Sequence, residues 1–233
     1  MPGSLRPSDV EIRPYREADR ASVRDVCYRT GYMGRPVDWQ WYDRESFADM
    51  FSGYYTDREP ESALVAELDG VVSGYLLGCL DTTRATSAGV AAARHIVRRG
   101  LAFRRGTAGV IWRTVGDTLV DVARRRFDPR ELEFSDDRWP AHFHIDLLDP
   151  ARGAGVGRRL VQRWLESLRD REVPGCHVQT FAENTNALAF FEALGFRRFG
   201  APAIVQGLRS PAGVRLHTQV LVLDLLDSAS RTA

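Results

Sequence analysis

The sequence predicts an α/β (α+β) fold, in which a sheet of short strands is flanked by amphipathic helices. Two observations carry this prediction. Apolar and polar residues alternate in short runs such as 10–15, and apolar residues recur at helical spacing in longer runs such as 155–172. The composition agrees, because 44% apolar and 27% charged residues are typical of a globular protein. With 233 residues, the chain is long enough for one large domain or two small ones.

The chain begins with a short strand and a helix. Residues 10–15 alternate between apolar and polar side chains, as in a half-buried strand. The following run, 16–32, has apolar residues at helical spacing, with Asp19 as the expected N-cap and Gly31 as the expected end.

Two further features complete the first third of the chain. The run 33–55 is rich in aromatic residues and predicts a second short helix, whose side chains either pack in the core or form the wall of a substrate pocket. Residues 62–80 predict a hairpin, because two apolar runs flank the tight-turn dipeptide Asp69-Gly70.

Residues 84–140 are rich in arginine and have apolar residues at helical spacing, so they predict a mostly helical insertion. Between Arg84 and Arg130 the chain carries eleven arginines against three aspartates. This basic surface is either a solvated face or a docking face for an acidic substrate, nucleotide phosphates or a partner chain. We expect no nucleic-acid partner, because the net charge of the whole chain is only +1 and aromatic residues are sparse among the arginines.

The second half of the chain alternates strands and helices. The predicted elements are a strand at 142–149, a helix at 155–172, a strand at 176–181, a helix at 185–196 and a closing strand at 217–225. The last residues, 227–233, predict a disordered tail.

Composition excludes several kinds of chemistry. All 32 basic residues apart from histidine are arginine, so no lysine is present to form a Schiff base or to act in a nucleotide-binding P-loop. Cys27, Cys79 and Cys176 are odd in number and widely spaced, which favours buried free thiols over disulfides or a zinc site. No apolar segment suggests a secretory signal or a membrane span, so we expect a cytoplasmic, bacterial protein with no membrane partner.

A glycine-rich turn joins the strand at 142–149 to the helix at 155–172. Gly153, Gly155 and Gly157 let backbone approach a ligand closely, and a helix N-terminus presents unpaired N–H groups and a positive dipole. Such a turn predicts an anion site. Basic residues add charge at its rim: Arg152, Arg158 and Arg159.

Three motifs compete for this turn. A Walker A loop requires a lysine, which the chain lacks. A dinucleotide fingerprint requires glycine at position 158, where the chain has Arg158. The pattern R-x-x-G-x-G/A remains, and residues 152–157, RGAGVG, satisfy it.

The segments LLDPARGAGVGRRLV (147–161) and NTNALAFFEALGF (184–196) together resemble the GNAT superfamily of acetyl-CoA-dependent N-acetyltransferases. In that family the loop is followed by N-x-x-A-x-x-x-Y and then G-F, matched here by Asn184, Ala187 and Gly195-Phe196. More narrowly, IRPYREADRASV, GYLLGCLDT and HIDLLD resemble the acetyltransferase-like C-terminal domain of O-GlcNAcase, here as a stand-alone protein.

The resemblance implies a GNAT-like mixed, splayed and mostly antiparallel sheet of six or seven strands, with the helical insertion before the central strand. It implies one acetyltransferase-like domain over 1–233. Within it we expect N-terminal strands and helices (9–83), the insertion (84–140), an acyl-CoA-binding half (141–226) and the tail (227–233).

The resemblance also implies acetyl-CoA as co-substrate, lying between the strands at 142–149 and 176–181. Backbone at Leu147 and Leu148 would pair with the pantetheine amides, the loop amides would bind the pyrophosphate, and Asn184 would contact the cofactor arm. The expected cofactor-binding residues are Leu147, Leu148, Arg152, Gly153, Ala154, Gly155, Val156, Gly157, Arg158, Asn184 and Phe191.

Two departures from the family pattern affect these expectations. The usual spacing is P-x-x-R-G, but Pro150 is one residue closer to Arg152. The tyrosine that commonly protonates the leaving thiolate is Phe191 here, so another acid acts, the thiolate leaves into solvent, or the chain binds without catalysis.

The strand at 142–149 supplies the candidate catalytic residues. Strand alternation puts His142, His144 and Asp146 on one face, where a base could deprotonate an attacking amine, and Asp146 is the first choice. These three side chains could instead be structural, or bind a metal, although no further ligand signature supports a metal and we expect none. Glu183 is a weaker base candidate.

The sequence thus predicts an acetyl-CoA-dependent N-acetyltransferase that works by direct attack of an amine, without a covalent acyl-enzyme. The alternatives are a non-catalytic acyl-CoA-binding or interaction module and a nucleic-acid-binding protein using the arginine-rich insertion. The acceptor (small amine, peptide or protein lysine) stays open, and a homodimer is compatible with the sequence.

Overall fold

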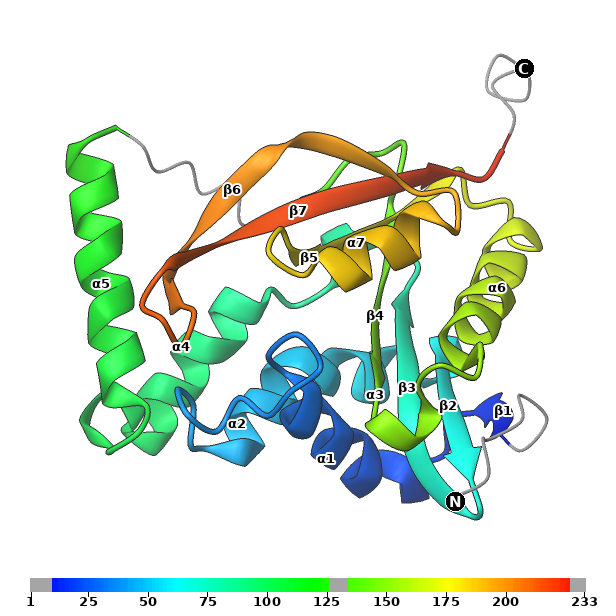
Figure 1. The fold of residues 1–233 in the computed structure, drawn as a ribbon, viewed down its shortest axis with the longest axis horizontal. Helices are drawn as coiled ribbons and strands as arrows, with labels where there is room; N and C mark the ends of the chain where they lie inside the picture. The colour runs from blue at the N-terminus through cyan, green and yellow to red at the C-terminus, as the bar shows by residue number, and fades with distance from the viewer. Residues whose placement is uncertain (1–9, 126–133, 227–233) are drawn as a thin grey trace.

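The fold is a seven-stranded mixed sheet flanked by helices, in a computed structural model that describes residues 10–125 and 134–226 (Figure 1). The predicted disordered tail, 227–233, lies outside the described residues, as do residues 126–133 of the predicted insertion. The strands are β1 (Val10–Pro14), β2 (Ala63–Leu68), β3 (Val71–Cys79), β4 (Ala141–Leu147), β5 (Gly175–Phe181), β6 (Arg197–Arg209) and β7 (Arg215–Asp224). They lie in the order β1-β2-β3-β4-β5-β7-β6.

Seven α-helices lie in the described part of the chain. They are α1 (Arg20–Thr30), α2 (Arg44–Ala48), α3 (Tyr54–Arg58), α4 (Ala88–Arg99), α5 (Ala108–Ala123), α6 (Val156–Arg169) and α7 (Thr185–Glu192). A π-helical turn at Asp49–Gly53 joins α2 to α3, so the second helix predicted within 33–55 is found as a continuous helical run. None of the described helices is long and apolar enough to cross a membrane.

The sheet splays at its centre, as the fold prediction required. Neighbouring strands pair antiparallel except β4 and β5, which run parallel and pair only at Ala141↔Cys176 and His142↔His177. On its other side, β4 pairs with β3 from His142 to Leu147. Beyond His142, therefore, β4 has a bonded partner on one edge and diverges from β5 on the other.

Two hydrophobic cores cover the two faces of the sheet. One joins α1 to β2 and β3 through residues such as Val26, Val65 and Tyr75, and it also takes in Phe47 and Tyr55 from the aromatic run. The other joins α6 and α7 to the opposite face through residues such as Trp164 and Phe143. The aromatic run is thus mainly core, although Trp39 and Tyr42 stay exposed.

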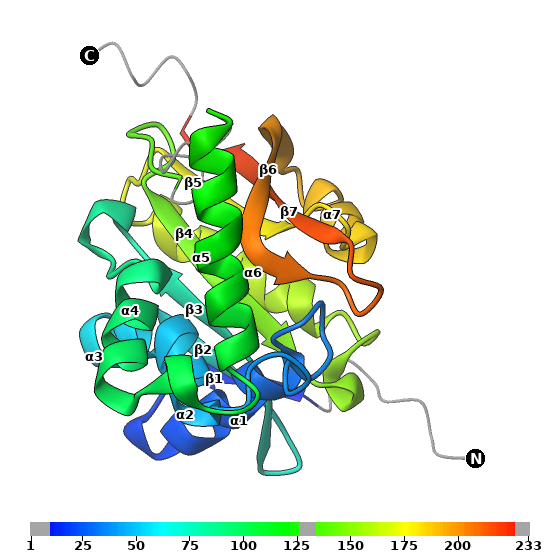
Figure 2. The same cartoon turned by 90° about the vertical axis from the view of Figure 1, so that its left-hand side faces the viewer.

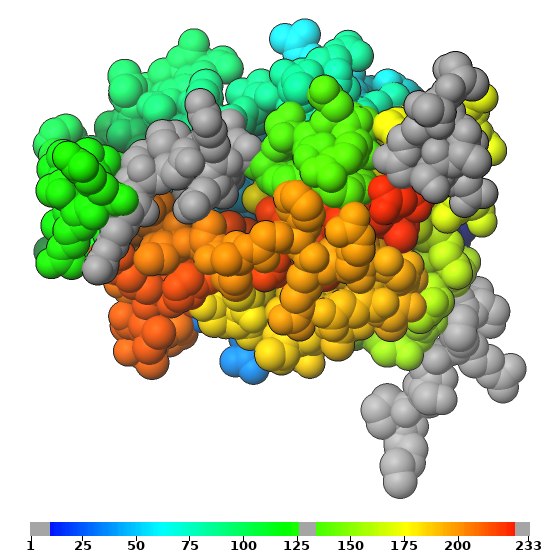
Figure 3. Space-filling model, turned by 90° about the horizontal axis from the view of Figure 1, so that it is seen from above, coloured from blue at the N-terminus to red at the C-terminus, as the bar shows by residue number. Residues whose placement is uncertain are grey.

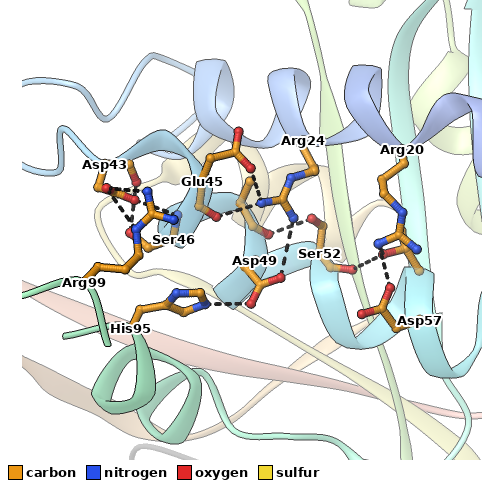
Figure 4. Close-up of polar contacts among 12 residues, drawn as sticks. Arg20, Arg24, Asp43, Glu45, Ser46, Asp49, Ser52, Asp57, His95 and Arg99 are labelled. Carbon is orange, nitrogen blue, oxygen red and sulfur yellow. Dashed lines mark hydrogen bonds and ion pairs between the residues drawn. The ribbon is translucent and has the colours of Figure 1, made fainter. Parts of the chain in front are cut away.

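The insertion forms one end of the molecule, where α5 lies against β6 (Figures 2 and 3). Helix α4 is held by polar contacts, because the His95 ring lies 2.6 Å from Asp49 and Arg99 lies 3.0 Å from Asp43 (Figure 4). The insertion is helical as predicted from α4 to Ala123, but residues 134–140 form no helix.

One sequence-based expectation about elements was wrong, and another was confirmed in position only. The sequence suggested no strand at 197–209, but β6 lies there; Gly200, Pro202 and Gly207 interrupt its pattern, and its register with β7 shifts twice. Asp19 precedes α1 as expected but makes no cap bond, because its carboxylate pairs with Arg13 at 2.7 Å. Gly31 does end α1.

Candidate functional site

The glycine turn and the start of α6 form the predicted anion site. Gly153 and Gly155 have φ of 79° and 71°, the left-handed region that glycine adopts most readily, and Gly155 is the N-cap of α6. No side chain caps the helix and no acid lies in its first turn, so its first N–H groups point outward uncompensated. A Cβ at Gly153 or Gly155 would meet no atom within 4 Å, which leaves the front of the turn open to a ligand.

The arginines around this turn have different roles. Arg152 is tied down: its guanidinium donates to the carbonyls of Leu147 and Gly34, each at 2.8 Å, and to Asp149 at 2.7 Å. Arg159 points to β1, where it donates to the Val10 carbonyl. Arg158 is the rim arginine that is exposed at the start of α6. The turn's affinity for an anion therefore rests on backbone more than on side-chain charge.

The open edge of β4 faces β5. The Leu148 N–H donates to the Ser73 carbonyl at 2.8 Å, so the backbone of alternate residues, Asp146 and His144, also faces β3. Ile145 and Leu147 accordingly turn their backbone groups toward the side where β5 diverges. The sequence analysis expected Leu147 and Leu148 to pair with pantetheine. The N–H of Leu148 is already bonded to Ser73, whereas Ile145, which the sequence analysis did not name, turns its backbone to the open edge.

Asn184 and Phe191 lie on α7. The Asn184 side-chain oxygen accepts a bond from the Ala187 N–H at 3.2 Å, so it is the N-cap of that helix. Phe191 is buried, with its ring 5.9 Å from Phe143 and 5.8 Å from Phe196. Its side chain thus packs in the hydrophobic core beneath the diverging strands.

Asp146 shares one face of β4 with His142 and His144, as strand alternation predicted, and in the structure this face is the α1 side of the sheet. The Tyr75 hydroxyl donates to its carboxylate at 2.5 Å, and the Thr30 hydroxyl lies against it. Burial raises the pKa of Asp146 to about 6, although both hydroxyls favour the carboxylate and lower it. The side chain is only half-buried by surface area, so it can exchange a proton near neutral pH. Tyr75 and Thr30 could not be found from the sequence, because the pairing of β3 with β4 brings them there.

The two histidines of β4 differ in their hydrogen bonding. Both ring nitrogens of His142 have partners at 2.7 Å, the hydroxyls of Tyr55 and Thr82. The ring of His144 packs 5.2 Å from Tyr55, and no hydrogen bond from another described residue reaches its nitrogens. Burial lowers the pKa of His144 to about 4, so the ring is neutral at physiological pH and able to accept a hydrogen bond.

The remaining polar groups offer little support for other chemistry. Among the described residues, no three His, Cys, Asp or Glu side chains lie close enough to hold a metal ion. Glu183 accepts from the His217 ring at 2.8 Å; burial raises its pKa, but the bonds from His217 outweigh this and lower it below the ordinary value. Glu183 is therefore a fixed carboxylate and a poor proton acceptor.

The three cysteines are buried free thiols, as the sequence predicted. Burial raises the pKa of Cys27 and of Cys79 to about 12, and it raises the pKa of Cys176 as well. A thiol, unlike a thiolate, is a poor nucleophile.

We therefore expect native protein to resist alkylation by iodoacetamide at neutral pH. Mass spectrometry should detect carbamidomethyl groups on all three cysteines only after unfolding. Rapid labelling of any one of them in the native protein would contradict the burial that excludes a cysteine acyl-enzyme.

Comparisons with known proteins agree with this geometry. Residues 124–196, which contain β4, the glycine turn, α6, β5 and α7, match the Acetyltransferase (GNAT) family. The crystal structure of a protein named SsHAT is 28% identical, with a TM-score of 0.66 over 94% of this chain and 100% of that one.

More distant structures share the fold. The yncA protein of Salmonella typhimurium, solved with its cofactor acetyl-CoA, is 16% identical, with a TM-score of 0.56 over 97% of this chain and 99% of that one. The polyamine N-acetyltransferase of Drosophila melanogaster is 15% identical, with a TM-score of 0.55 over 93% of this chain and 100% of that one. Residues 124–196 thus match the GNAT acetyltransferase family, and the chain as a whole has a fold that it shares with solved N-acetyltransferases.

Proposed function

We propose that the protein is an acetyl-CoA-dependent N-acetyltransferase that moves the acetyl group directly to an amine. The observation that carries this proposal is that two features lie on β4. The strand leads into the open anion turn, and one of its faces carries Asp146, a carboxyl group with a pKa of about 6. A cofactor anchored at the turn and a base on the same strand are what acyl transfer to an amine requires.

Acetyl-CoA would lie along the open edge of β4. The N–H groups at the start of α6 would bind its pyrophosphate, and the backbone of Ile145 and the N–H of Leu147, whose carbonyl accepts from Arg152, would pair with its pantetheine amides. Arg152 would hold the turn in shape through its bonds to Leu147 and Gly34.

We place all of 1–233 in this one domain. The closer kinship with the O-GlcNAcase domain and a place in the bacterial cytoplasm stay predictions.

In the proposed reaction the acceptor nitrogen attacks the thioester carbonyl carbon, and its proton passes to the Asp146 carboxylate, directly or through a water. The carbon–sulfur bond then breaks and CoA leaves as a thiolate. Because Phe191 has no hydroxyl and is buried, the thiolate would take its proton from solvent or from protonated Asp146. His144 would orient the acceptor or the water, and His142 would position Tyr55 and His144.

An aromatic rim beside this site favours an acceptor that carries a positive charge. Tyr32 and Trp39 meet edge to face at 5.2 Å, and Tyr32 lies 6.4 Å from Phe181 at the end of β5. Burial raises the pKa of Tyr32, the nearby Glu183 carboxylate raises it further, and the Arg35 guanidinium lowers it. Aromatic faces with a carboxylate attract an ammonium group, so we propose a small amine with a second cationic group.

A free-thiol release assay tests the proposal. Wild-type protein with acetyl-CoA should release CoA thiol only when a suitable amine is added, and diamines and polyamines should lead the panel. Tight binding of acetyl-CoA without release for any amine would favour the alternative, a non-catalytic acyl-CoA-binding module, which Phe191 in place of tyrosine motivates.

A further inference from the structure

Helix α5 buries Val110 and Ile111 of its first turn in an apolar cluster, but from Trp112 onward it presents apolar side chains to solvent and charged side chains to the protein. On its inner side, Asp117 pairs with Arg209 at 2.6 Å and Asp121 pairs with Arg215 at 3.0 Å, both from the β6–β7 hairpin. On its outer side, Leu119 is 65% exposed. A helix on the surface of a monomer normally has the opposite arrangement. The inversion indicates that something covers the outer side.

The outer apolar residues form one stripe. Trp112, Val115, Leu119 and Val122 are spaced i, i+3, i+7 and i+10, which places them on one side of a helix, and all four are exposed. The helix has 16 residues, so it is roughly 24 Å long. Gly116 lies beside the stripe, and a Cβ built there would meet no atom within 4 Å.

The stripe continues into the preceding turn. The Trp112 indole N–H donates to the Ala102 carbonyl at 3.0 Å, which brings Trp112 beside Phe103, and Phe103 is 86% exposed. Of the twelve exposed large hydrophobic residues among those described, eight lie in the insertion: Val90, Val97, Phe103, Trp112, Val115, Leu119, Val120 and Val122. Single exposed apolar residues are normal, but a cluster of this kind marks an interaction surface.

Helix α4 is inverted in the same way. Its inner side carries His95 and Arg99, which pair with Asp49 and Asp43 (Figure 4), while Val90 and Val97 face outward. Ion pairs and one small apolar cluster around Leu101 and Ile111 fasten the two helices of the insertion to the domain, and further apolar side chains are left on the outside. Figure 2 shows both helices on the end of the molecule that faces the viewer.

We propose that the α5 stripe is a homodimer interface, in which α5 of a second copy packs against it. The stripe carries no charge: Asp117 and Asp121 are paired inward, and Arg113 donates to the Gly207 carbonyl at 2.7 Å. An uncharged apolar helix face is complementary to itself under a twofold axis and needs no partner of opposite charge. An anionic membrane or nucleic acid would instead call for basic side chains along the stripe.

Five large apolar side chains gather on this face. Trp112 and Phe103 are aromatic side chains, which bury ~150–250 Å² each, and three further apolar residues extend the face along the helix. A standard interface buries about 800 Å² per partner, so these five side chains would form its centre and residues around the stripe would form its rim. Crossing at about 50° near Gly116 would let the helices touch closely while their arginine-bearing ends diverge.

Sedimentation equilibrium of the purified protein tests this inference. Wild type should sediment at twice the chain mass of 26.2 kDa. Val122→Arg should weaken dimerisation by ~100-fold or more, because it buries an unpaired charge. The matched control is Val71→Arg on β3, which changes a valine of similar exposure (62% against 53%) far from the stripe and should leave the dimer intact. Circular dichroism confirms that both variants fold.

Crosslinking gives a second readout that does not depend on a destabilising change. Gly116→Cys should form a covalent dimer with a short bis-maleimide, whereas wild type should not, because its own thiols are buried. A wild-type monomer at high micromolar concentration would overturn the inference, as would a Val122→Arg protein that dimerises like wild type. A monomer that binds anionic vesicles or oligonucleotides through this stripe would overturn it in favour of another partner.

Discussion

Replacing Gly155 with valine is expected to weaken acetyl-CoA binding by about 10- to 100-fold. Gly155 has a φ of 71° at the N-cap of α6, and a non-glycine residue held in such a conformation costs ~1–3 kcal/mol. With valine, the free turn would relax to another conformation, and acetyl-CoA binding would have to restore the strained one at this cost. Each ~1.4 kcal/mol is a factor of ten in affinity. The Cβ would also project into the space in front of the turn, which no protein atom occupies within 4 Å. Isothermal titration calorimetry measures the change directly.

Two control variants separate this effect from general damage. Gly70→Val introduces comparable strain (φ of 78°) in the β2–β3 turn, so it should lower stability without changing acetyl-CoA affinity. Arg158→Ala removes one exposed charge and should weaken binding by less than about 5-fold. If Arg158→Ala proves more harmful than Gly155→Val, side-chain charge, and not backbone, holds the pyrophosphate.

Replacing Asp146 with asparagine is expected to lower kcat by ~10²–10⁴-fold, the usual contribution of a general base. The amide oxygen can still accept the hydrogen bond from Tyr75, so the fold around it should persist. Acetyl-CoA affinity should stay nearly unchanged, because the Asp146 carboxylate accepts its hydrogen bond from Tyr75 and the substitution leaves the backbone N–H groups at the start of α6 in place. Full turnover by both Asp146→Asn and His144→Ala would show that the base lies elsewhere.

The pH profile gives an independent view of the same group. Because the pKa of Asp146 is about 6, the carboxylate form, which can accept a proton, predominates only above that pH. The rate should therefore rise with pH through about 6 and lose this limb in Asp146→Asn. Tyr75→Phe should move the limb to higher pH, since the Tyr75 hydroxyl lowers the pKa of Asp146. An unmoved limb would mean that another group titrates there.

Local sequence patterns predicted much of the fold and the glycine turn at the start of α6. The hairpin at 62–80 turns at Asp69-Gly70, and the glycine turn opens α6, because both depend on residues adjacent in sequence. Strand alternation also placed His142 and Asp146 on one face, since the period of a strand needs no knowledge of its neighbours. Features that depend on one local period were therefore predictable.

Features that depend on pairing between distant segments could not be predicted. The contact of Tyr75 with Asp146 joins residues 71 positions apart and exists only through the register of β3 with β4. Arg152 was expected at the rim of the anion turn, but it bonds Gly34 across 118 positions. In the insertion, the helical period was visible, but which side of α5 faces the domain depends on Arg209 and Arg215 of the β6–β7 hairpin. Sequence reasoning had missed that hairpin's first strand.

The most direct test of the central claim follows a radiolabelled acetyl group through a single turnover. Wild-type protein in excess over labelled acetyl-CoA is mixed with an amine found in the thiol-release panel and quenched with acid at successive times. Direct transfer predicts that label passes from acetyl-CoA to the amine, that none precipitates with the protein at any time, and that Asp146→Asn slows the transfer. Label that appears on the protein before it reaches the amine, or that never leaves acetyl-CoA, would contradict the account.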